Sequence, residues 1–493
     1  MNTKIDASSA SNNWNTIKWD PATQEVRRLQ MRIAKATREG RHNKVKALQW
    51  LLTHSFYTKA LAVKRVVQND GKRTPGVDKV IWKTPRQKTE AIETLRRNGY
   101  QLQPLRRIYI PKKNGKQRPL GIPTMKDRAM QALHAMALEP IAETKADPNS
   151  YGFRAKRSTA DAIGHCFYAL ARSYAPTWIL EGDIKACFER IDNSWLLTHI
   201  LMDKVILNKW LTAGYKEEGK LYPTESGTPQ GGVISPILAN LTLDGLEETV
   251  KTRNRGQNKV HVVRYADDFI ITGSSQSFLE NEIKPTVEQF LHERGLELSP
   301  EKTKITHIQE GFEFLGFNIR KYGRKLLIKP SQKNVKSFLE EIKQTLQSSY
   351  SISTDIMINR LNPKIRGWAN YYQHVVAKKT FAKVDHEIFW MVWRWLKRKH
   401  PKKSAEWRYK KYFRTQGNNR WIFFTRTRDQ NGDIAFRDLA KASQIPIKRH
   451  VKIRSQANPF DPKYEDYFKQ RERMKGKSKY RVTGPSQDGL RKA

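Results

Sequence analysis

The sequence of 493 residues contains only two cysteines, Cys166 and Cys187. Two thiols cannot form a disulfide framework or a four-cysteine zinc site, so we expect a reducing compartment and no zinc. No apolar run approaches the roughly 20 residues that a membrane span requires. The first fifteen residues also lack the apolar core of a signal peptide. The sequence therefore predicts a cytoplasmic chain with no membrane partner.

Acidic residues are also scarce. The chain has 48 Asp and Glu against 92 Lys and Arg, which gives a net charge of +44. A surplus of that size repels itself and indicates a polyanionic partner. The content of 38% hydrophobic and 10% aromatic residues still allows a buried core, which excludes a disordered basic tail. At about 150 residues per domain, the length predicts roughly three domains.

The pattern of apolar residues changes along the chain. Residues 26–67 show helical periodicity in two stripes separated by Gly40, which predicts two surface helices. Between residues 105 and 320, short apolar runs alternate with helical stretches, a mixture that indicates an α+β core with an antiparallel sheet. After Pro330 the pattern is helical again. Residues 391–460 then hold 19 Lys or Arg against 4 Asp or Glu, together with many aromatic residues.

Paired carboxylates stand between two alternating apolar runs, in the order Tyr265-Ala266-Asp267-Asp268-Phe269. The pattern predicts a β-hairpin with both aspartates at its tip, although Asp is also a common turn residue. A second apolar run ends at Asp183. A strand-terminal Asp beside such a pair can hold two divalent cations about 3.5–4 Å apart, as in two-metal phosphoryl transfer.

Oxygen ligands suit Mg²⁺, and no imidazole or thiolate is required. We therefore expect two Mg²⁺ ions at this centre. Asp183, Asp267 and the carbonyl of Ile184 are the expected ligands, and Asp268 is expected to contribute charge more than direct coordination.

The same residues resemble a known family. Tyr-Ala-Asp-Asp on a hairpin looks like the signature of reverse transcriptases, and Asp183-Ile184-Lys185 followed by Phe188 resembles their other metal-binding strand. Five further blocks resemble those of the family and follow in the family's order: 110–123, 149–154, 227–236, 296–303 and 312–317.

The resemblance implies roles for single residues. Lys112 and Arg118 would grip the triphosphate as the fingers close, or would contact the template backbone instead. Phe188 stands where the family carries the bulky gate that clashes with a ribose 2′-hydroxyl; the other interpretation is a core phenylalanine. Gln230 would contact the nucleotide or the template, and Ala266 would lie against the nascent base pair.

The flanking segments indicate the subfamily. Residues 56–66 and 74–78 resemble the N-terminal extension of group II intron and non-LTR-type enzymes, whereas residues 360–372 and 389–401 resemble the maturase (thumb) domain. Residues 449–461 resemble the DNA-binding segment that usually precedes an HNH endonuclease in this family. The resemblance as a whole favours bacterial, cyanobacterial-like group II intron-encoded proteins.

The HNH endonuclease of longer family members uses paired cysteines and a His-Asn-His core. No cysteine follows Cys187, and only His450 follows His400. We therefore expect this chain to lack its own endonuclease, which leaves the source of its primer open.

Basic residues on the flanking segments are the candidates for RNA or DNA contact, because basic and aromatic surfaces bind RNA through phosphates and stacking. Trp393 and Trp395 are more simply explained as the core of a helical bundle, since residues two apart cannot both face one partner. The candidate contacts are Lys64, Arg65, Arg360, Lys364, Arg366, Arg398, Lys402, Lys403, Arg449 and Lys452.

The expected fold is α+β: a right-hand polymerase whose fingers and palm carry an antiparallel sheet, followed by an α-helical thumb/maturase domain and a small basic C-terminal segment. The expected divisions are a helical N-terminal extension over 1–80, fingers and palm over 81–328, the thumb/maturase domain over 329–425, a DNA-binding segment over 426–475 and a basic tail over 476–493.

The resemblance implies an RNA-directed DNA polymerase of a mobile group II intron, which also binds the intron RNA to assist splicing and supports target-primed reverse transcription into DNA. Its partners would be intron RNA, target DNA, an RNA template with a DNA primer, and deoxynucleoside triphosphates, in the bacterial cytoplasm or nucleoid. One alternative is a non-enzymatic RNA-binding splicing factor, against which the intact aspartates argue. Another is a reverse transcriptase of a CRISPR or retron system, against which the maturase-like helices argue.

Overall fold

The N-terminal part of the chain is helical. The structure, a computed structural model, describes residues 13–111, 115, 117–224, 227–228, 231–252, 260–348, 350–417, 419–428 and 433–476. Three helices replace the two expected between residues 26 and 67, because Ser55 takes an extended backbone (φ −64°, ψ 132°) that ends one helix and precedes the next. Apolar faces of these helices pack on α5. The helices are α1 (Trp19–Arg38), α2 (His42–His54), α3 (Phe56–Gln68), α4 (Pro85–Thr94) and α5 (Met125–Lys145).

The palm sheet has four antiparallel strands in the order β6-β7-β3-β8, which confirms the expected antiparallel sheet. Alternate residues of its central strands enter different cores, because successive strand side chains point to opposite faces. Leu180 and Phe269 join the core of the N-terminal helices, whereas Ile179 and Ile270 join a second core that continues into the thumb. The strands are β3 (Trp178–Asp183), β6 (Val262–Tyr265), β7 (Asp268–Gly273) and β8 (Lys304–His307).

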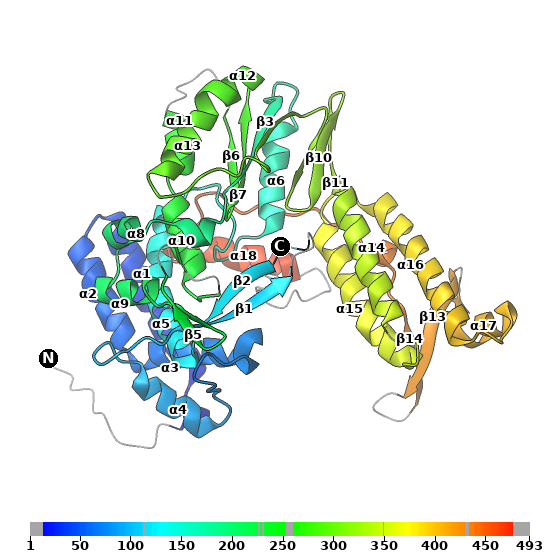
Figure 1. Cartoon of the computed structure of the whole chain (residues 1–493). Helices are drawn as coiled ribbons and strands as arrows, with labels where there is room; N and C mark the ends of the chain where they lie inside the picture. The colour runs from blue at the N-terminus through cyan, green and yellow to red at the C-terminus, as the bar shows by residue number, and fades with distance from the viewer. Residues whose placement is uncertain are drawn as a thin grey trace.

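A second sheet, in the order β2-β1-β4-β5, forms part of the fingers. Its β1–β2 hairpin is antiparallel and reaches toward the centre of the molecule, whereas β1 and β4 are parallel (Figure 1). Helices cover the palm and join it to the fingers. The strands are β1 (Leu105–Pro111), β2 (Gln117–Ile122), β4 (Tyr215–Glu217) and β5 (Lys220–Tyr222). The helices are α6 (Thr159–Leu170), α7 (Cys187–Arg190), α8 (Asn193–His199), α9 (Lys204–Leu211), α10 (Ser235–Leu243), α11 (Leu246–Thr252), α12 (Gln276–Phe278) and α13 (Lys284–His292).

The thumb is a bundle of long helices that follows a three-stranded sheet, β11-β10-β9. Three of its helices begin at serine caps: Ser331 accepts from the N–H of Asn334, Ser353 from that of Ile356, and Ser404 from that of Trp407. No helix in the described part of the chain has both the length and the apolar character needed to cross a membrane. The elements are β9 (Phe312–Phe314), β10 (Phe317–Tyr322), β11 (Lys325–Pro330), α14 (Gln332–Gln347), α15 (Thr354–Tyr372), α16 (Lys378–Lys399) and α17 (Ala405–Tyr412).

A fourth sheet follows the thumb helices, in the order β12-β13-β14, with bounds β12 (Phe413–Gln416), β13 (Asn419–Arg428) and β14 (Ile434–Asp438). A boundary at residue 425 would therefore cut β13. Figure 1 shows that this sheet lies with the thumb, whereas α18 (Glu465–Gly476) lies behind the palm and fingers. The chain beyond the sheet therefore returns to the palm.

Buried ionic contacts fix this returning segment, residues 441–476. Asp161 on α6 is fully buried and accepts from Arg471 at 2.6 Å, from the backbone N–H of Ile453 at 2.7 Å and from the ring of His450 at 2.8 Å. Arg157 donates to the carbonyl of Ser455 at 2.7 Å. The C-terminal segment is thus packed as part of the palm, and its role in DNA binding stays a prediction.

Candidate polymerase active site

The two acidic runs of the sequence meet at one edge of the palm sheet. β6 and β7 form the expected hairpin, with Ala266 and Asp267 in the turn and Asp268 opening β7. β3 pairs with β7 so that Asp183 lies directly opposite Asp268. Ala266 has φ +57°, a left-handed backbone that a tight turn imposes on a residue with a small side chain. The register therefore brings Asp183, Asp267 and Asp268 together.

Burial and mutual repulsion act on two of the three carboxylates. Burial, followed by the charges of Asp267 and Asp183, raises the pKa of Asp268 to about 7. Burial also raises the pKa of Asp267, with a smaller contribution from Asp183. The Asp268 side chain keeps solvent-accessible area, yet protein atoms surround its carboxyl group on most sides. Bound cations relieve such crowding.

Lys302 is a residue of this centre that the sequence analysis did not single out. Its Nζ donates to both oxygens of Asp183, at 3.0 and 2.9 Å. Partial burial opposes its charge, but the hydrogen bond and charge of Asp183 outweigh burial and raise the pKa of Lys302. One sequence feature could have pointed to Lys302: it lies in the block 296–303, one of the seven that resemble the reverse transcriptase family.

Arg264 is a second residue that the sequence analysis left without a role. Its buried guanidinium forms an ion pair with Asp244 and donates to Asn240 at 3.1 Å. It also donates to the carbonyl of Ala266 at 3.4 Å, in the turn that carries Asp267. Arg264 therefore ties the β6–β7 hairpin to α10 and the residue that follows it.

The donor set fits Mg²⁺ by its chemistry. Ile184 is buried and forms an isolated antiparallel bridge with Leu298. The two hydrogen bonds of that bridge use the carbonyl of Asp183 and the N–H of Lys185, so they leave the carbonyl of Ile184 out. In the described residues, no group of three or more His, Cys, Asp or Glu is arranged to hold a metal ion. Carboxylate and carbonyl oxygens are nevertheless the ligands that Mg²⁺ prefers.

The predicted nucleotide contacts have three described members. Phe188 is half-buried, and its carbonyl accepts from the backbone N–H of Thr228 at 2.6 Å. Arg118 lies on β2 opposite Ile110, and its positive charge partly opposes the burial that raises the pKa of Asp267. Ala266 is in the turn between β6 and β7. Lys112 and Gln230 lie outside the described residues.

The ten predicted RNA or DNA contacts differ in exposure. Four are half-buried and have partners: Lys64 lies over the ring of Trp19 at 4.0 Å, Arg65 pairs with Glu139 at 3.1 Å, Lys364 pairs with Glu341 at 3.0 Å, and Lys452 donates to Ser455 at 3.0 Å. The remaining six are exposed: Arg360, Arg366, Arg398, Lys402, Lys403 and Arg449.

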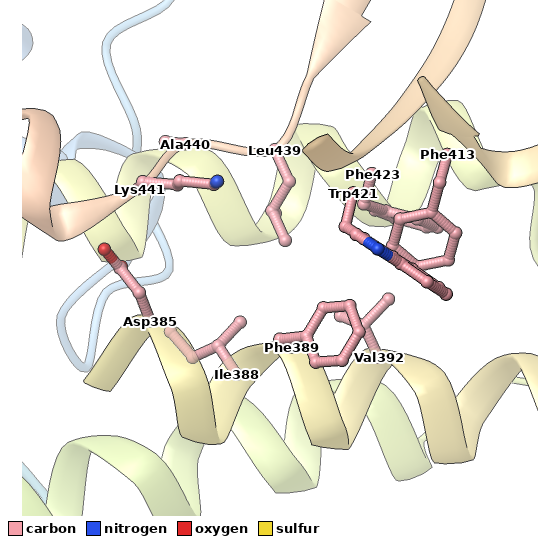
Figure 2. A pocket seen from close by; sticks show the side chains of 10 residues that line it. All are labelled: Asp385, Ile388, Phe389, Val392, Phe413, Trp421, Phe423, Leu439, Ala440 and Lys441. Carbon is pink, nitrogen blue, oxygen red and sulfur yellow. The ribbon is translucent and has the colours of Figure 1, made fainter. Parts of the chain in front are cut away.

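The thumb presents basic and aromatic side chains side by side. A hollow near the end of α16 is lined by Arg394, Lys397, Arg398 and Pro401. Figure 2 shows a second crevice, between α16 and residues 439–441, with the Phe389 and Trp421 rings at one end.

The two neighbouring tryptophans of α16 differ in burial. Trp395 is buried, as expected for a bundle core, whereas Trp393 is half-buried and packs edge to face on Trp421 at 5.7 Å. Only Trp395 therefore lies fully inside.

Three family models match the chain. The model for "Reverse transcriptase (RNA-dependent DNA polymerase)" matches residues 110–319, the range that holds the three aspartates. "N-terminal domain of reverse transcriptase" matches residues 14–95. "Group II intron, maturase-specific domain" matches residues 335–413, which cover the thumb helices.

Curated relatives agree with these models. The chain is 30% identical to the group II intron-encoded protein LtrA of Lactococcus lactis subsp. cremoris, over 66% of this chain and 69% of the relative. It is 34% identical to protein YkfC of Escherichia coli K12, over 54% of this chain and 81% of the relative. An uncharacterized 91 kDa protein in the cob intron of Schizosaccharomyces pombe is 28% identical, over 69% of this chain and 50% of that protein. The chain belongs to the group II intron-encoded proteins: it is an RNA-directed DNA polymerase joined to a maturase domain that assists splicing.

Proposed function

We propose that Asp183, Asp267 and Asp268 are the catalytic carboxylates and that they work with two Mg²⁺ ions. The observation that carries this proposal is the register that sets Asp183 opposite Asp268, with Asp267 in the adjoining turn. Asp183, Asp267 and the carbonyl of Ile184 would hold the metals. When bound, the ions would activate the primer 3′-hydroxyl and neutralise charge on the departing pyrophosphate.

The residues of the chain would orient the reacting groups. The 3′-oxygen of the primer bonds to the α-phosphorus of the nucleotide as the bond to the pyrophosphate oxygen breaks. Arg118, with Lys112, would hold the phosphates, and Ala266 would leave room for the new base pair. Phe188 would exclude a ribose 2′-hydroxyl, and Gln230 would contact the nucleotide or the template.

Lys302 would neutralise Asp183 before metal binds. Its ammonium group occupies both carboxylate oxygens and would have to withdraw when a cation takes them. Competition of this kind predicts weaker metal binding than three unpaired carboxylates would give, because the ion must displace a charge-assisted hydrogen bond.

The basic surface would bind RNA and DNA. The six exposed candidates, together with the hollow formed by Arg394, Lys397 and Arg398, would contact phosphates of the intron RNA or the template. We further propose that the polymerase copies intron RNA from a primer at a DNA target. We place this activity in the bacterial cytoplasm or nucleoid, because intron RNA and target DNA meet there.

Primer extension tests the proposal. The full-length protein, a labelled DNA primer on an RNA template, and Mg²⁺ should give extended product. The double variant Asp267→Ala, Asp268→Ala should lose the rate by about a thousandfold or more, because a metal supplies several kcal/mol of transition-state stabilisation. It should still bind the primer duplex. Asp466→Ala, which removes an aspartate 90% exposed on α18, is the matched control. Extension by the double variant at the wild-type rate would refute the assignment.

A further inference from the structure

Phe153 carries an exposed phenyl ring beside the predicted sugar gate. The ring is 43% exposed, and its centroid lies 6.4 Å from that of Phe188 at an interplanar angle of 78°, an edge-to-face contact. The backbone of Phe153 has φ +56°. A bulky residue in this left-handed region is strained, and such strain persists only where the surrounding structure imposes it.

The residues before Phe153 are clamped to the catalytic hairpin. The N–H of Tyr151 donates to the carbonyl of Arg264 at 2.8 Å, and the N–H of Arg264 donates to the carbonyl of Asn149 at 3.1 Å. Gly152 lies so close to the turn that a Cβ on it would be 2.4 Å from the nitrogen of Ala266. Asn240 also donates to the carbonyl of Gly152 at 2.9 Å. The turn that carries Asp267 therefore also fixes the position of Phe153.

The residue after Phe153 is equally fixed. The guanidinium of Arg154 is buried, donates to Glu143 at 2.8 Å, and donates to the carbonyls of Asp147 and Ser150 at 2.7 and 3.0 Å. Phe153 thus stands between two neighbours that are both hydrogen-bonded to the palm. Among the described residues, its ring meets that of Phe188 edge to face.

The main chain of Phe188 is held from the opposite side. Its carbonyl accepts from the N–H of Thr228 at 2.6 Å, and a Cβ on Gly227 would lie 2.5 Å from that same carbonyl oxygen. Ala186, with φ +48°, starts the short helix that carries Phe188. The backbone of the gate is therefore fixed, and rotation of the side chain is its remaining freedom. The Phe188 ring packs against the core of the N-terminal helices and meets the Phe153 ring.

We propose that Phe153 is a positioning residue that holds the Phe188 ring across the site of the ribose 2′-hydroxyl and so contributes to the choice of deoxyribonucleotides. This inference rests on the proposed role of Phe188 as the sugar gate. Phe153 would act through Phe188 and would not itself contact the sugar. Removal of its ring would let the gate rotate away, so ribonucleotides would enter more readily.

The test measures kcat/KM for dCTP and for CTP opposite a template guanine, with the full-length protein. Phe153→Ala should lower the dCTP/CTP ratio about three- to tenfold, the range expected for loss of an edge-to-face aromatic pair. The change should come from a lower KM for CTP. Phe153→Asn removes the same ring with a residue that tolerates positive φ, so it gives the same result if the alanine variant folds poorly. Phe153→Tyr keeps the ring and should restore the ratio. Phe167→Ala, at a phenylalanine 44% exposed on α6, is the matched control.

The Phe188 variants separate this inference from the proposed function. Phe188→Ala should lower the ratio further, and Phe153→Ala should add nothing to it in the double variant, because both act through one ring. If Phe188→Ala leaves the ratio unchanged, the gate assignment is wrong. A different result would be that Phe188→Ala lowers the ratio while Phe153→Ala and Phe153→Asn give the same ratio as the control Phe167→Ala. That result would support Phe188 as the sugar gate and overturn the positioning role of Phe153. Additive effects in the double variant would overturn it too.

Discussion

Arg264 shows how one buried side chain can hold the turn of a β-hairpin. Its guanidinium joins Asp244, Asn240 and the carbonyl of Ala266, so its loss would leave the Asp244 carboxylate buried without its partner. Arg264→Met should therefore lower the free energy of unfolding by about 3–5 kcal/mol, measured by urea titration. Arg86→Met, which breaks an exposed pair with Glu90, should leave the free energy of unfolding nearly unchanged. Equal losses for the two variants would show that Arg264 does not stabilise the hairpin.

Single residues of the site were predictable to different degrees. Asp183, Asp267 and Asp268 follow from strand patterns that end in acids, and the pairing of β6, β7 and β3 confirms the predicted hairpin. Lys302 was not predictable in this way, because it meets Asp183 across 119 residues of sequence. Local periodicity reports which face a residue occupies and carries no information on such distant partners.

At the scale of elements, the C-terminal segment differs most from its prediction. The sequence suggested a separate basic DNA-binding segment over 426–475, but its first residues belong to β13 and its last helix packs on the palm. The contact of His450 with Asp161 spans 289 residues, so no local pattern reveals it. Elements with clear periodicity, such as α14 and α16, were predictable because their apolar stripes are buried in the thumb core.

Asp161 should control the docking of that segment. Burial alone would raise the pKa of Asp161, but the hydrogen bond and charge of His450 and the charge of Arg471 outweigh it and lower that pKa. A lowered carboxyl pKa stabilises the docked state above about pH 4, the ordinary value, and the stabilisation is lost as the pH falls below it. The substitution Asp161→Asn should remove this stabilisation at neutral pH, because it leaves Arg471 buried without a counter-ion.

Limited proteolysis at pH 7 measures this effect. Trypsin should cut the C-terminal segment of Asp161→Asn at least about tenfold faster than that of the wild type, since loss of one partner of a buried ion pair costs about 3–5 kcal/mol. Asp466→Asn, which alters an exposed pair with Lys469, is the control. Cleavage of Asp161→Asn at the wild-type rate would mean that other contacts hold the segment.

At the scale of the whole molecule, three histidines with lowered pKa values should make the fold sensitive to acid. Burial lowers the pKa of His134 and of His374 to about 4, and that of His165 to about 3. Because unfolding returns them to about 6.5, the unfolded state binds more protons as the pH falls from 6.5 toward 4, and the free energy of unfolding decreases. For His134 alone the loss is about 2 kcal/mol at pH 5.

The pH dependence of unfolding checks this expectation. Urea titrations between pH 7 and pH 4.5 should show a smaller decrease for His134→Phe than for the wild type, whatever the stability of each at pH 7. His292→Gln, at an exposed position, should keep the wild-type slope. A wild-type slope in His134→Phe would show that this histidine is not held neutral.

The whole chain combines a polymerase centre with a basic thumb. The central claim is that three aspartates at the edge of the palm sheet are required for DNA synthesis, whereas other surfaces assist splicing. The most direct measurement follows both activities in one reaction, with precursor RNA of the chain's own group II intron, a DNA primer and Mg²⁺. For Asp267→Ala, Asp268→Ala, the account predicts loss of complementary DNA and protein-assisted splicing at the wild-type level. Complementary DNA at the wild-type level, or equal loss of both activities in a folded variant, would contradict it.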